Sequence, residues 1–319
     1  MASSLRDPEY DDALRQMNDA LEGAQDALLR EHAEAHPILF VVGPPRSGTT
    51  LALQLLSSNL DVAYVNNLTA AFWSAPLIGV RLSKKLLGDD YCSSYSSNFG
   101  QTQGAREPHE FGRFWIDLLA PYGLSEPDEH AGTRVDWKRL QLVLNNMSEA
   151  FGRTSVFKAP MLGWYVAEVQ RWLPRACFVK TVRNPLDNAL SILKYRRAMR
   201  GSEEEWVSLR PGNIEALSGL SVERQVAGQL YYLERSFQRQ VEQVGGRNVL
   251  EVRYEDMCAD PGRFLEDVRD LVSRVGSRVE LRGEVPASFE VSRARRAEEP
   301  RYEAVAQAID ESSDGVTNG

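Results

Sequence analysis

The chain has 319 residues, of which 43% are hydrophobic, and this is enough apolar material for one large core. Its formal net charge of −8 argues against a nucleic-acid partner, because a phosphate backbone is bound by an excess of Lys and Arg. The sequence contains no run of about 18 apolar residues, so we expect no membrane span.

The predicted elements form an α/β pattern in which strands alternate with helices. We expect strands at residues 38–42, 61–65, 154–157, 176–182 and 249–253. We expect helices at 7–33, 49–60, 68–87 with a break at Pro76, 111–119, 137–150, 164–172, 186–199, 222–244 and 261–275. This order predicts one mainly parallel sheet of about five strands, with helices on both faces and right-handed crossovers.

The same pattern predicts the domain organisation. We expect an N-terminal helical arm at 1–36, a single α/β domain at 37–300 and a C-terminal tail at 301–319. Insertions are expected at about 85–135 and 201–220, and the polar residues from 310 onward are expected to be disordered.

The cysteines and the N-terminus indicate the compartment. Cys92, Cys177 and Cys258 are far apart and lack the spacing of metal ligands. The first 28 residues are acidic and helical in period, unlike a secretory signal. We therefore expect a cytoplasmic protein with free, mostly packed thiols.

The segment from Phe40 to Leu51 is the most informative in the chain. A buried strand, a tight loop and a helix start bring backbone N–H groups together, and the helix dipole adds about half a positive charge. The glycines and the last Thr of the Walker A pattern are present, but Thr49 replaces its Lys and Arg46 is the nearest cation. This argues against an ATP or GTP hydrolase and favours another activated phosphate anhydride.

A second segment points to a second anionic group. Arg183 follows the strand at 176–182, and Ser191 lies on the second turn of the next helix. Ligands of open α/β sheets bind beyond the carboxyl ends of the strands, and a guanidinium with a hydroxyl suits a phosphate. Either residue alone fits an ordinary surface position, but together with the first loop they favour a phosphate site.

These segments resemble the PAPS-dependent sulfotransferases, which transfer a sulfuryl group from 3′-phosphoadenosine 5′-phosphosulfate (PAPS). Residues 45–50 match the family's Pro-Lys/Arg-Ser-Gly-Thr-Thr signature, and residues 183–185 with Ser191 match its second motif. Residues 156–160 and 249–256 are similar to the Lys-x-Pro and Tyr-Glu-Asp strand ends of the bacterial branch. The resemblance implies a fold like that of the P-loop-containing nucleotide hydrolases.

The resemblance also implies a role for each matching residue. The 5′-phosphosulfate would be held by the first loop, made of Pro45, Arg46, Ser47, Gly48, Thr49 and Thr50. The 3′-phosphate would be held by Arg183 and Ser191, with Arg293 in a late basic segment closing on it. Arg46 and Lys158 would act on the transferring group, and no metal is implied.

The catalytic base is left open by the sequence. The His of many cytosolic members corresponds here to Pro160, and the Glu of a related subfamily is replaced by Asn66-Asn67. The candidates are His109 and Glu110, which stand with Glu107 just before a helix. The same cluster would equally serve as a helix cap.

The acceptor site is predicted by elimination between residues 91–114 and the insertion at 201–220. The aromatic residues there suit an apolar or aromatic acceptor, and they are Tyr91, Tyr95, Phe99, Phe111 and Trp206, with Trp115 just beyond. We therefore predict a sulfotransferase acting on the hydroxyl or amine of a small-molecule or lipid-like acceptor. The alternatives are a P-loop nucleotide or metabolite kinase and a non-catalytic nucleotide-binding protein. No sequence feature predicts the oligomeric state.

Overall fold

A computed structural model describes residues 8–88 and 91–314. Within these residues five strands form a single sheet in the order β2-β3-β1-β4-β5, and every neighbouring pair is parallel. The strands are β1 (Ile38–Val42), β2 (Ala63–Tyr64), β3 (Ser155–Lys158), β4 (Cys177–Val182) and β5 (Val249–Arg253). The predicted single-domain α/β fold with a parallel sheet is confirmed.

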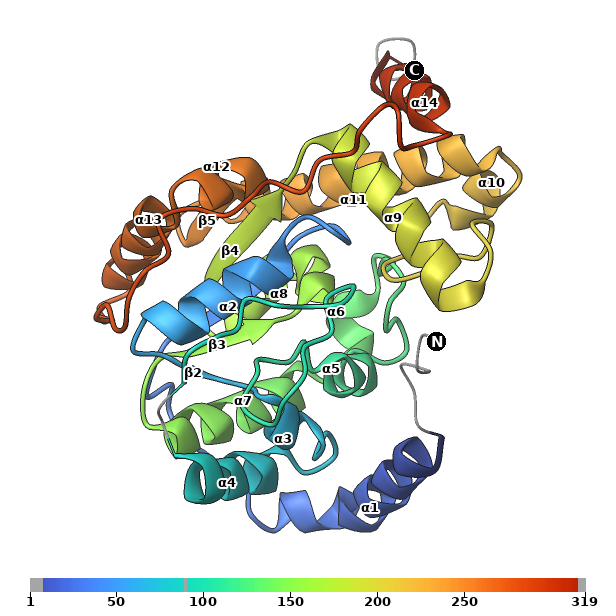
Figure 1. Ribbon diagram of the computed structural model, residues 1–319. Coiled ribbons are helices and arrows are strands. Elements are labelled where there is room, and N and C mark those ends of the chain that lie inside the picture. The colour runs from blue at the N-terminus through green and yellow to red at the C-terminus, as the bar shows by residue number, and fades with distance from the viewer. Residues whose placement is uncertain (1–7, 89–90, 315–319) are drawn as a thin grey trace.

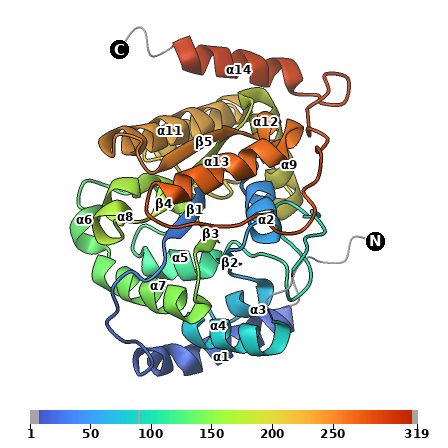
Figure 2. The same ribbon diagram turned by 90° about the vertical axis from the view of Figure 1, so that its left-hand side faces the viewer.

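Helices cover both faces of the sheet (Figures 1 and 2). In chain order they are α1 (Pro8–Asp26), α2 (Thr49–Asn59), α3 (Asn67–Ala70), α4 (Pro76–Leu87), α5 (Gly112–Leu118), α6 (Ala131–Arg134), α7 (Trp137–Phe151), the 3₁₀ helix η1 (Pro160–Trp164), α8 (Val166–Trp172), α9 (Pro185–Arg200), α10 (Ile214–Ser218), α11 (Val222–Gln243), α12 (Tyr254–Ala259), α13 (Pro261–Ser273) and α14 (Tyr302–Asp314). None of these helices within 8–88 and 91–314 has both the length and the apolar content needed to cross a bilayer.

The central strand β1 is buried on both faces. Ile38, Phe40 and Val42 pack with residues of α5, α7 and α8. Leu39 and Val41 face the opposite side and pack with residues of α2 and α13. Burial on both faces explains why this strand reads as a continuous apolar run rather than as an alternating one.

The parallel sheet brings three chemically active segments to one edge. Val41 of β1 pairs with Lys158 at the end of β3, and Arg183 directly follows β4. The turn after β1 starts α2 at the same edge and faces α9 (Figure 1). The carboxyl edge of the sheet is therefore where the predicted site residues can meet.

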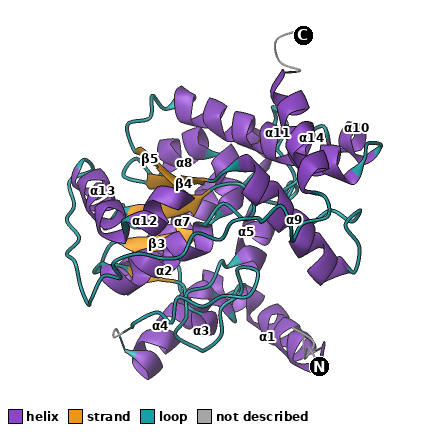
Figure 3. Ribbon diagram, turned by 45° about the horizontal axis from the view of Figure 1, so that its top comes forward, coloured by secondary structure: helices purple, strands orange, loops and turns teal. Residues whose placement is uncertain are grey.

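The C-terminus differs from the expected tail. Residues 302–314 form α14, which packs on α9 and α11, and its Val305 and Ala308 are buried. The helix was missed because few apolar residues mark its inner face within a polar sequence. Residues 315–319, also expected in the tail, lie outside the described residues. A long connection between α13 and α14 crosses the molecule as loop (Figure 3).

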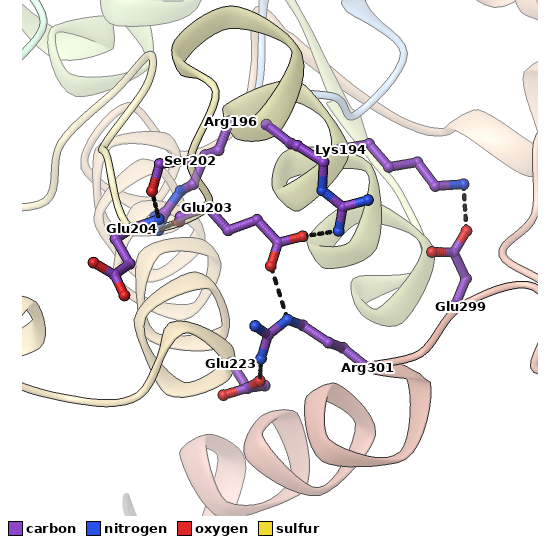
Figure 4. A network of polar contacts seen from close by, with 9 residues as sticks. Lys194, Arg196, Ser202, Glu203, Glu204, Glu223, Glu299 and Arg301 are labelled. Atoms are coloured by element: carbon purple, nitrogen blue, oxygen red, sulfur yellow. Dashed lines mark hydrogen bonds and ion pairs between the residues drawn. The ribbon is translucent and has the colours of Figure 1, made fainter.

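A network of charged side chains fastens this C-terminal segment to the domain (Figure 4). Arg301 donates from Nε to Glu203 at 2.8 Å and also pairs with Glu223 of α11. Lys194 of α9 pairs with Glu299. The insertion at 201–220 and the start of α14 are thus held against the same two helices.

Arg196 of α9 is completely buried. Its guanidinium donates to the side-chain oxygens of Gln225 and Gln229 at 3.1 and 2.9 Å and lies 4.5 Å from the centre of the Trp206 ring. Burial lowers the pKa of Arg196 to about 10. The ring of Trp206, one of the aromatic residues named for the acceptor site, packs on this buried arginine, and its contact with an acceptor stays a prediction.

Candidate functional site

The turn after β1 has a backbone shape that requires glycine. Gly43 and Gly48 have φ angles of 152° and 99°. A Cβ atom at Gly43 would lie 2.5 Å from Thr181 Oγ1, and one at Gly48 would lie 2.6 Å from Cδ2 of Tyr254. Because both contacts are far too short, the tight approach of β4 and α12 depends on the missing side chains.

Ser47 shapes this turn from inside. Its hydroxyl donates to the carbonyl of Pro44 at 2.8 Å and lies 2.7 Å from Thr181 Oγ1. Its N–H also donates to Pro44, at 3.3 Å. Pro45 is buried in the same turn. A direct role of Ser47 and Pro45 in donor binding stays a prediction, since these contacts use Ser47 within the loop.

The first turn of α2 has no side-chain cap. Gly48 occupies its N-cap position. Thr49 and Thr50 form the first turn, where backbone N–H groups have no partner inside the helix. Such a helix start attracts negative charge.

Arg46 reaches from the loop to α9. Its Nε donates to Ser191 Oγ at 3.2 Å. Its guanidinium lies 5.6 Å from the centre of the Phe99 ring and 5.9 Å from that of Tyr195. Burial lowers the pKa of Arg46, and the nearby Arg183 lowers it further. The loop cation and Ser191, predicted for different phosphate groups, are direct neighbours.

The Arg183 side chain contacts both the loop after β1 and the connection between α13 and α14. Its Nη1 donates to the carbonyl of Arg46 at 3.0 Å, its Nη2 donates to the carbonyl of Ser292, and its guanidinium lies 4.7 Å from the centre of the Tyr254 ring. Its Nε is buried and has no hydrogen-bond partner among residues 8–88 and 91–314. A buried donor without a partner is costly, so this N–H is suited to a bound anion.

The two arginines create a strongly positive site. In the described part of the chain, the hydrogen bonds of Arg46 and Arg183 go to a hydroxyl and to backbone carbonyls, and none goes to a carboxylate. Neighbouring guanidinium groups without such a counter-ion repel each other. Burial is the main cause of the lowered pKa of Arg46, and the charge of Arg183 lowers that pKa further. This is the setting in which a multiply charged anion is bound.

Lys158 connects the loop to a candidate base. Its Nζ donates to Thr50 Oγ1 at 2.9 Å and lies 2.7 Å from Glu110 Oε2. The Lys158 side chain is 6% exposed, whereas that of Glu110 is 38% exposed. Burial would raise the pKa of Glu110, but the charge and hydrogen bond of Lys158 outweigh it and hold that pKa below its usual value.

His109 has a different neighbourhood from Glu110. Its Nδ1 accepts the N–H of Phe111 at 2.8 Å, just before α5. A neutral imidazole that accepts at Nδ1 carries its proton on Nε2, so it has no free basic nitrogen. Desolvation lowers the pKa of His109, which favours this neutral form. The geometry therefore favours Glu110 over His109 as the base.

Glu107 is a loop anchor. It is buried, and its carboxylate accepts the hydroxyl of Tyr91 at 2.8 Å and the N–H of Ser94 at 3.2 Å. These bonds fix the segment after residue 90 to the turn before α5. Sequence reasoning grouped Glu107 with the candidate bases because only its contacts distinguish it from its neighbours.

The late basic segment reaches the Arg183 site through its backbone. The carbonyl of Ser292 accepts from Arg183, and the N–H of Ala294 donates to Asp187 Oδ1 at 2.7 Å. Arg293 is exposed and has no hydrogen bond or ion pair with the other described residues. Its contact with a phosphate stays a prediction.

Tyr254 and Glu255 are site residues whose roles the sequence did not reveal. Tyr254 lies under Arg183, and its hydroxyl accepts the N–H of Ser292 at 3.4 Å. Glu255 Oε1 accepts the N–H of Asn184 at 2.8 Å. Their signal was the Tyr-Glu-Asp motif itself, which supports the turn that carries Arg183.

Most aromatic residues of the predicted acceptor region have structural partners. Tyr91 packs on Tyr64 at 5.0 Å between ring centres, and Tyr95 packs on Phe289 at 5.1 Å. Phe111 and Trp115 belong to the core. Among the aromatic residues named for the acceptor, Phe99 is the one whose ring lies against a predicted donor group, the guanidinium of Arg46. The acceptor position stays a prediction.

No metal site emerges from the described residues, because no group of three or more His, Cys, Asp or Glu side chains there is placed to hold an ion. The described cysteines are free thiols, with Cys177 and Cys258 buried and Cys92 exposed. Burial raises the pKa of Cys177 to about 12, so this thiol is chemically inert near neutral pH.

Comparison with solved structures supports the fold. The structure resembles sulfotransferase STF9 from Mycobacterium avium, with a TM-score of 0.51 and 15% identity over 94% of this chain and 81% of that one. Sulfotransferase STF1 from Mycobacterium tuberculosis H37Rv gives a TM-score of 0.51 and 15% identity over 93% of this chain and 81% of that one. At this identity the likeness concerns the fold alone. No curated protein matches the sequence significantly.

The sequence itself matches a family model. The model described as "Sulfotransferase family" covers residues 37–273. The match contains residues 45–50, which we call the phosphate loop after their predicted role. It also contains Lys158, the turn with Arg183 and the whole sheet described above. This chain belongs to the sulfotransferase family.

Proposed function

We propose that this protein transfers the sulfuryl group of PAPS to a hydroxyl or amine of a small-molecule or lipid-like acceptor. The supporting observation is the meeting of Arg46 and Arg183 at one edge of the sheet, without a carboxylate bonded to either in the described residues. PAPS carries a phosphosulfate and a separate phosphate, so it can satisfy both cations.

The residues present fit such a donor. The first turn of α2, with Arg46, Thr50 and Lys158, would hold the 5′-phosphosulfate, and Arg183 with Ser191 would hold the 3′-phosphate. The unpartnered Nε of Arg183 supports this fit. Bound PAPS would supply an activated sulfuryl group, and Arg46 and Lys158 would stabilise negative charge on the departing nucleotide.

Lys158 would couple donor binding to the base. It is shared between Thr50 and Glu110, so an anion at the α2 terminus competes with Glu110 for its ammonium group. As Lys158 turns toward the anion, its charge lowers the pKa of Glu110 less. Burial then raises that pKa. Glu110 would then be a stronger base when the donor is bound than when it is absent.

Two other functions are separated from this one by ligand binding. A P-loop kinase would bind ATP with Mg²⁺, although Thr49 replaces the Walker Lys. A non-catalytic protein would bind the nucleotide without transfer.

The proposal also places the protein in a reducing cytoplasm, where Cys92, Cys177 and Cys258 would remain thiols.

The test compares thermal stabilisation by adenosine 3′,5′-bisphosphate and by ATP with Mg²⁺. We expect the bisphosphate to stabilise the protein by about 2.7 kcal/mol at a concentration 100 times its dissociation constant, and ATP to have little effect. The reverse order would indicate a kinase. A screen of acceptors with PAPS then distinguishes transfer from simple binding.

The Arg183→Ala variant should lose recognition of the 3′-phosphate. Removal of a charged hydrogen-bond donor costs about 1.5–3 kcal/mol, so the affinity for adenosine 3′,5′-bisphosphate should fall about 10- to 150-fold. The affinity for adenosine 5′-monophosphate should change little. Calorimetric titration with both nucleotides measures the difference.

The matched control for this variant is Arg263→Ala. Arg263 lies on α13, outside the late basic segment predicted to close on the 3′-phosphate, and its exposed side chain pairs with Asp267 one helical turn away at 2.9 Å. Such a surface pair contributes little to stability, so the control should bind both nucleotides as the wild type does. Equal weakening of both nucleotides by Arg183→Ala would contradict the assignment.

A further inference from the structure

Gly100 lies against the three groups that we assign to the 5′ end of the donor. A Cβ atom at this position would lie 3.3 Å from Thr50 Oγ1, 3.6 Å from Lys158 Nζ and 3.7 Å from Arg46 Nη1. These groups come from α2, β3 and the phosphate loop. They converge on the place that a side chain at residue 100 would occupy.

A tight turn holds Gly100 there. Asn98 and Gln101 exchange backbone hydrogen bonds of 2.8 and 2.9 Å. The two residues between them, Phe99 and Gly100, have φ angles of 50° and 88°. Positive φ at both central residues is typical of a type I′ turn, which accepts Gly and Asn.

The turn is fixed to the domain on both sides. Phe99 stacks on Tyr195 of α9, with 5.6 Å between ring centres. Gln54 of α2 donates to the carbonyl of Ser96 at 3.2 Å. The turn therefore bridges α2 and α9 across the phosphate loop.

The position of Gly100 also lies next to the candidate base. Lys158, one of its three neighbours, is the ion-pair partner of Glu110 at 2.7 Å. A group that moves from the donor loop to an acceptor activated by Glu110 must pass through this region. The transferable end of the donor is thus the part that a side chain at residue 100 would meet.

We propose that the turn at residues 98–101 is the roof of the donor site and that Gly100 is a specificity-determining residue that leaves room for the transferable sulfuryl group. This inference rests on the proposed function. A side chain at this position would fill the space over Thr50, Lys158 and Arg46, whereas a nucleotide without the sulfuryl group would still fit.

The test uses the Gly100→Asn variant, because Asn tolerates a positive φ better than most residues and so strains the turn little while it fills the space. Gly104→Asn is the control for backbone strain. Gly104 lies in the same loop with a φ of 105°, but a Cβ there would meet only Glu107 Cγ, at 3.9 Å. Calorimetry measures the affinities for PAPS and for adenosine 3′,5′-bisphosphate without any acceptor.

We expect Gly100→Asn to weaken PAPS binding about tenfold or more relative to bisphosphate binding, and Gly104→Asn to leave the ratio unchanged. An unchanged ratio of the two affinities in Gly100→Asn would overturn the proposal, whether both affinities stay the same or both fall equally. If Gly100→Asn does not fold, Gly100→Ala places a methyl group at the same point and carries the same expectation. A wild-type protein that binds neither ligand would instead refute the proposed function.

Discussion

Replacing Arg46 by Ala is expected to lower kcat for sulfuryl transfer by about 10²- to 10³-fold. The affinity for adenosine 3′,5′-bisphosphate should fall much less. Arg46 is the cation of the phosphate loop, and negative charge on the departing nucleotide grows most in the transition state. An interaction that strengthens in the transition state affects turnover more than binding.

The backbone of Arg46 requires a second variant. Its φ of 67° lies in the left-handed region, which Ala adopts at a cost. Arg46→Asn removes the cation with a residue that adopts this region more readily, so it should show the same loss of kcat without added strain. Steady-state kinetics and bisphosphate titration of both variants separate the loss of charge from a distorted loop. Wild-type turnover in Arg46→Asn would contradict the role.

The convergence of the residues that we assign to the donor could be predicted from the sequence for physical reasons. These residues lie at the ends of β1, β3 and β4, and the parallel sheet brings such ends to one edge whatever the loops do. Arg46, Lys158 and Arg183 therefore meet as expected. The glycines of the loop also follow from local backbone geometry, since Gly43 and Gly48 adopt positive φ angles.

Contacts between distant segments could not be predicted in the same way. Phe99 stacks on Tyr195, which lies 96 positions later in the sequence, and no local sequence pattern predicts this contact. Tyr254 reaches Arg183 only because β5 lies beside β4. Side-chain partners of this kind depend on the packed structure as a whole.

The side-chain partners of the candidate bases also could not be predicted, although these residues are close together in the sequence. Glu107, His109 and Glu110 are close neighbours in one loop, so the sequence treats them alike. In the folded protein each of them has a different partner. Glu107 meets Tyr91, His109 accepts from the backbone before α5, and Glu110 meets Lys158. Their chemistry differs through these neighbours.

The pH dependence should reflect the sharing of Lys158. Without donor, Lys158 holds the pKa of Glu110 below its ordinary 4.5, so the carboxylate stays ionised at neutral and mildly acidic pH. The kcat/KM for PAPS reflects the ionisation of the free enzyme, so it should fall only as the pH drops through that lowered pKa. The kcat reports the donor complex, and its loss should begin at higher pH because Lys158 then also serves the anion. Two coincident profiles would contradict this coupling.

The Glu110→Gln variant should lower the rate of transfer by about 10²- to 10⁴-fold, since the amide cannot take a proton from the acceptor. Binding of adenosine 3′,5′-bisphosphate should be retained, because Lys158 keeps its bond to Thr50. His109→Ala is the control from the same loop, and we expect it to change the rate by less than about tenfold, because the only free nitrogen of the neutral imidazole carries a proton.

Initial rates with the true acceptor measure both variants. Full activity of Glu110→Gln together with a large loss in His109→Ala would assign the base to His109. Full activity of both variants would show that the base is neither Glu110 nor His109.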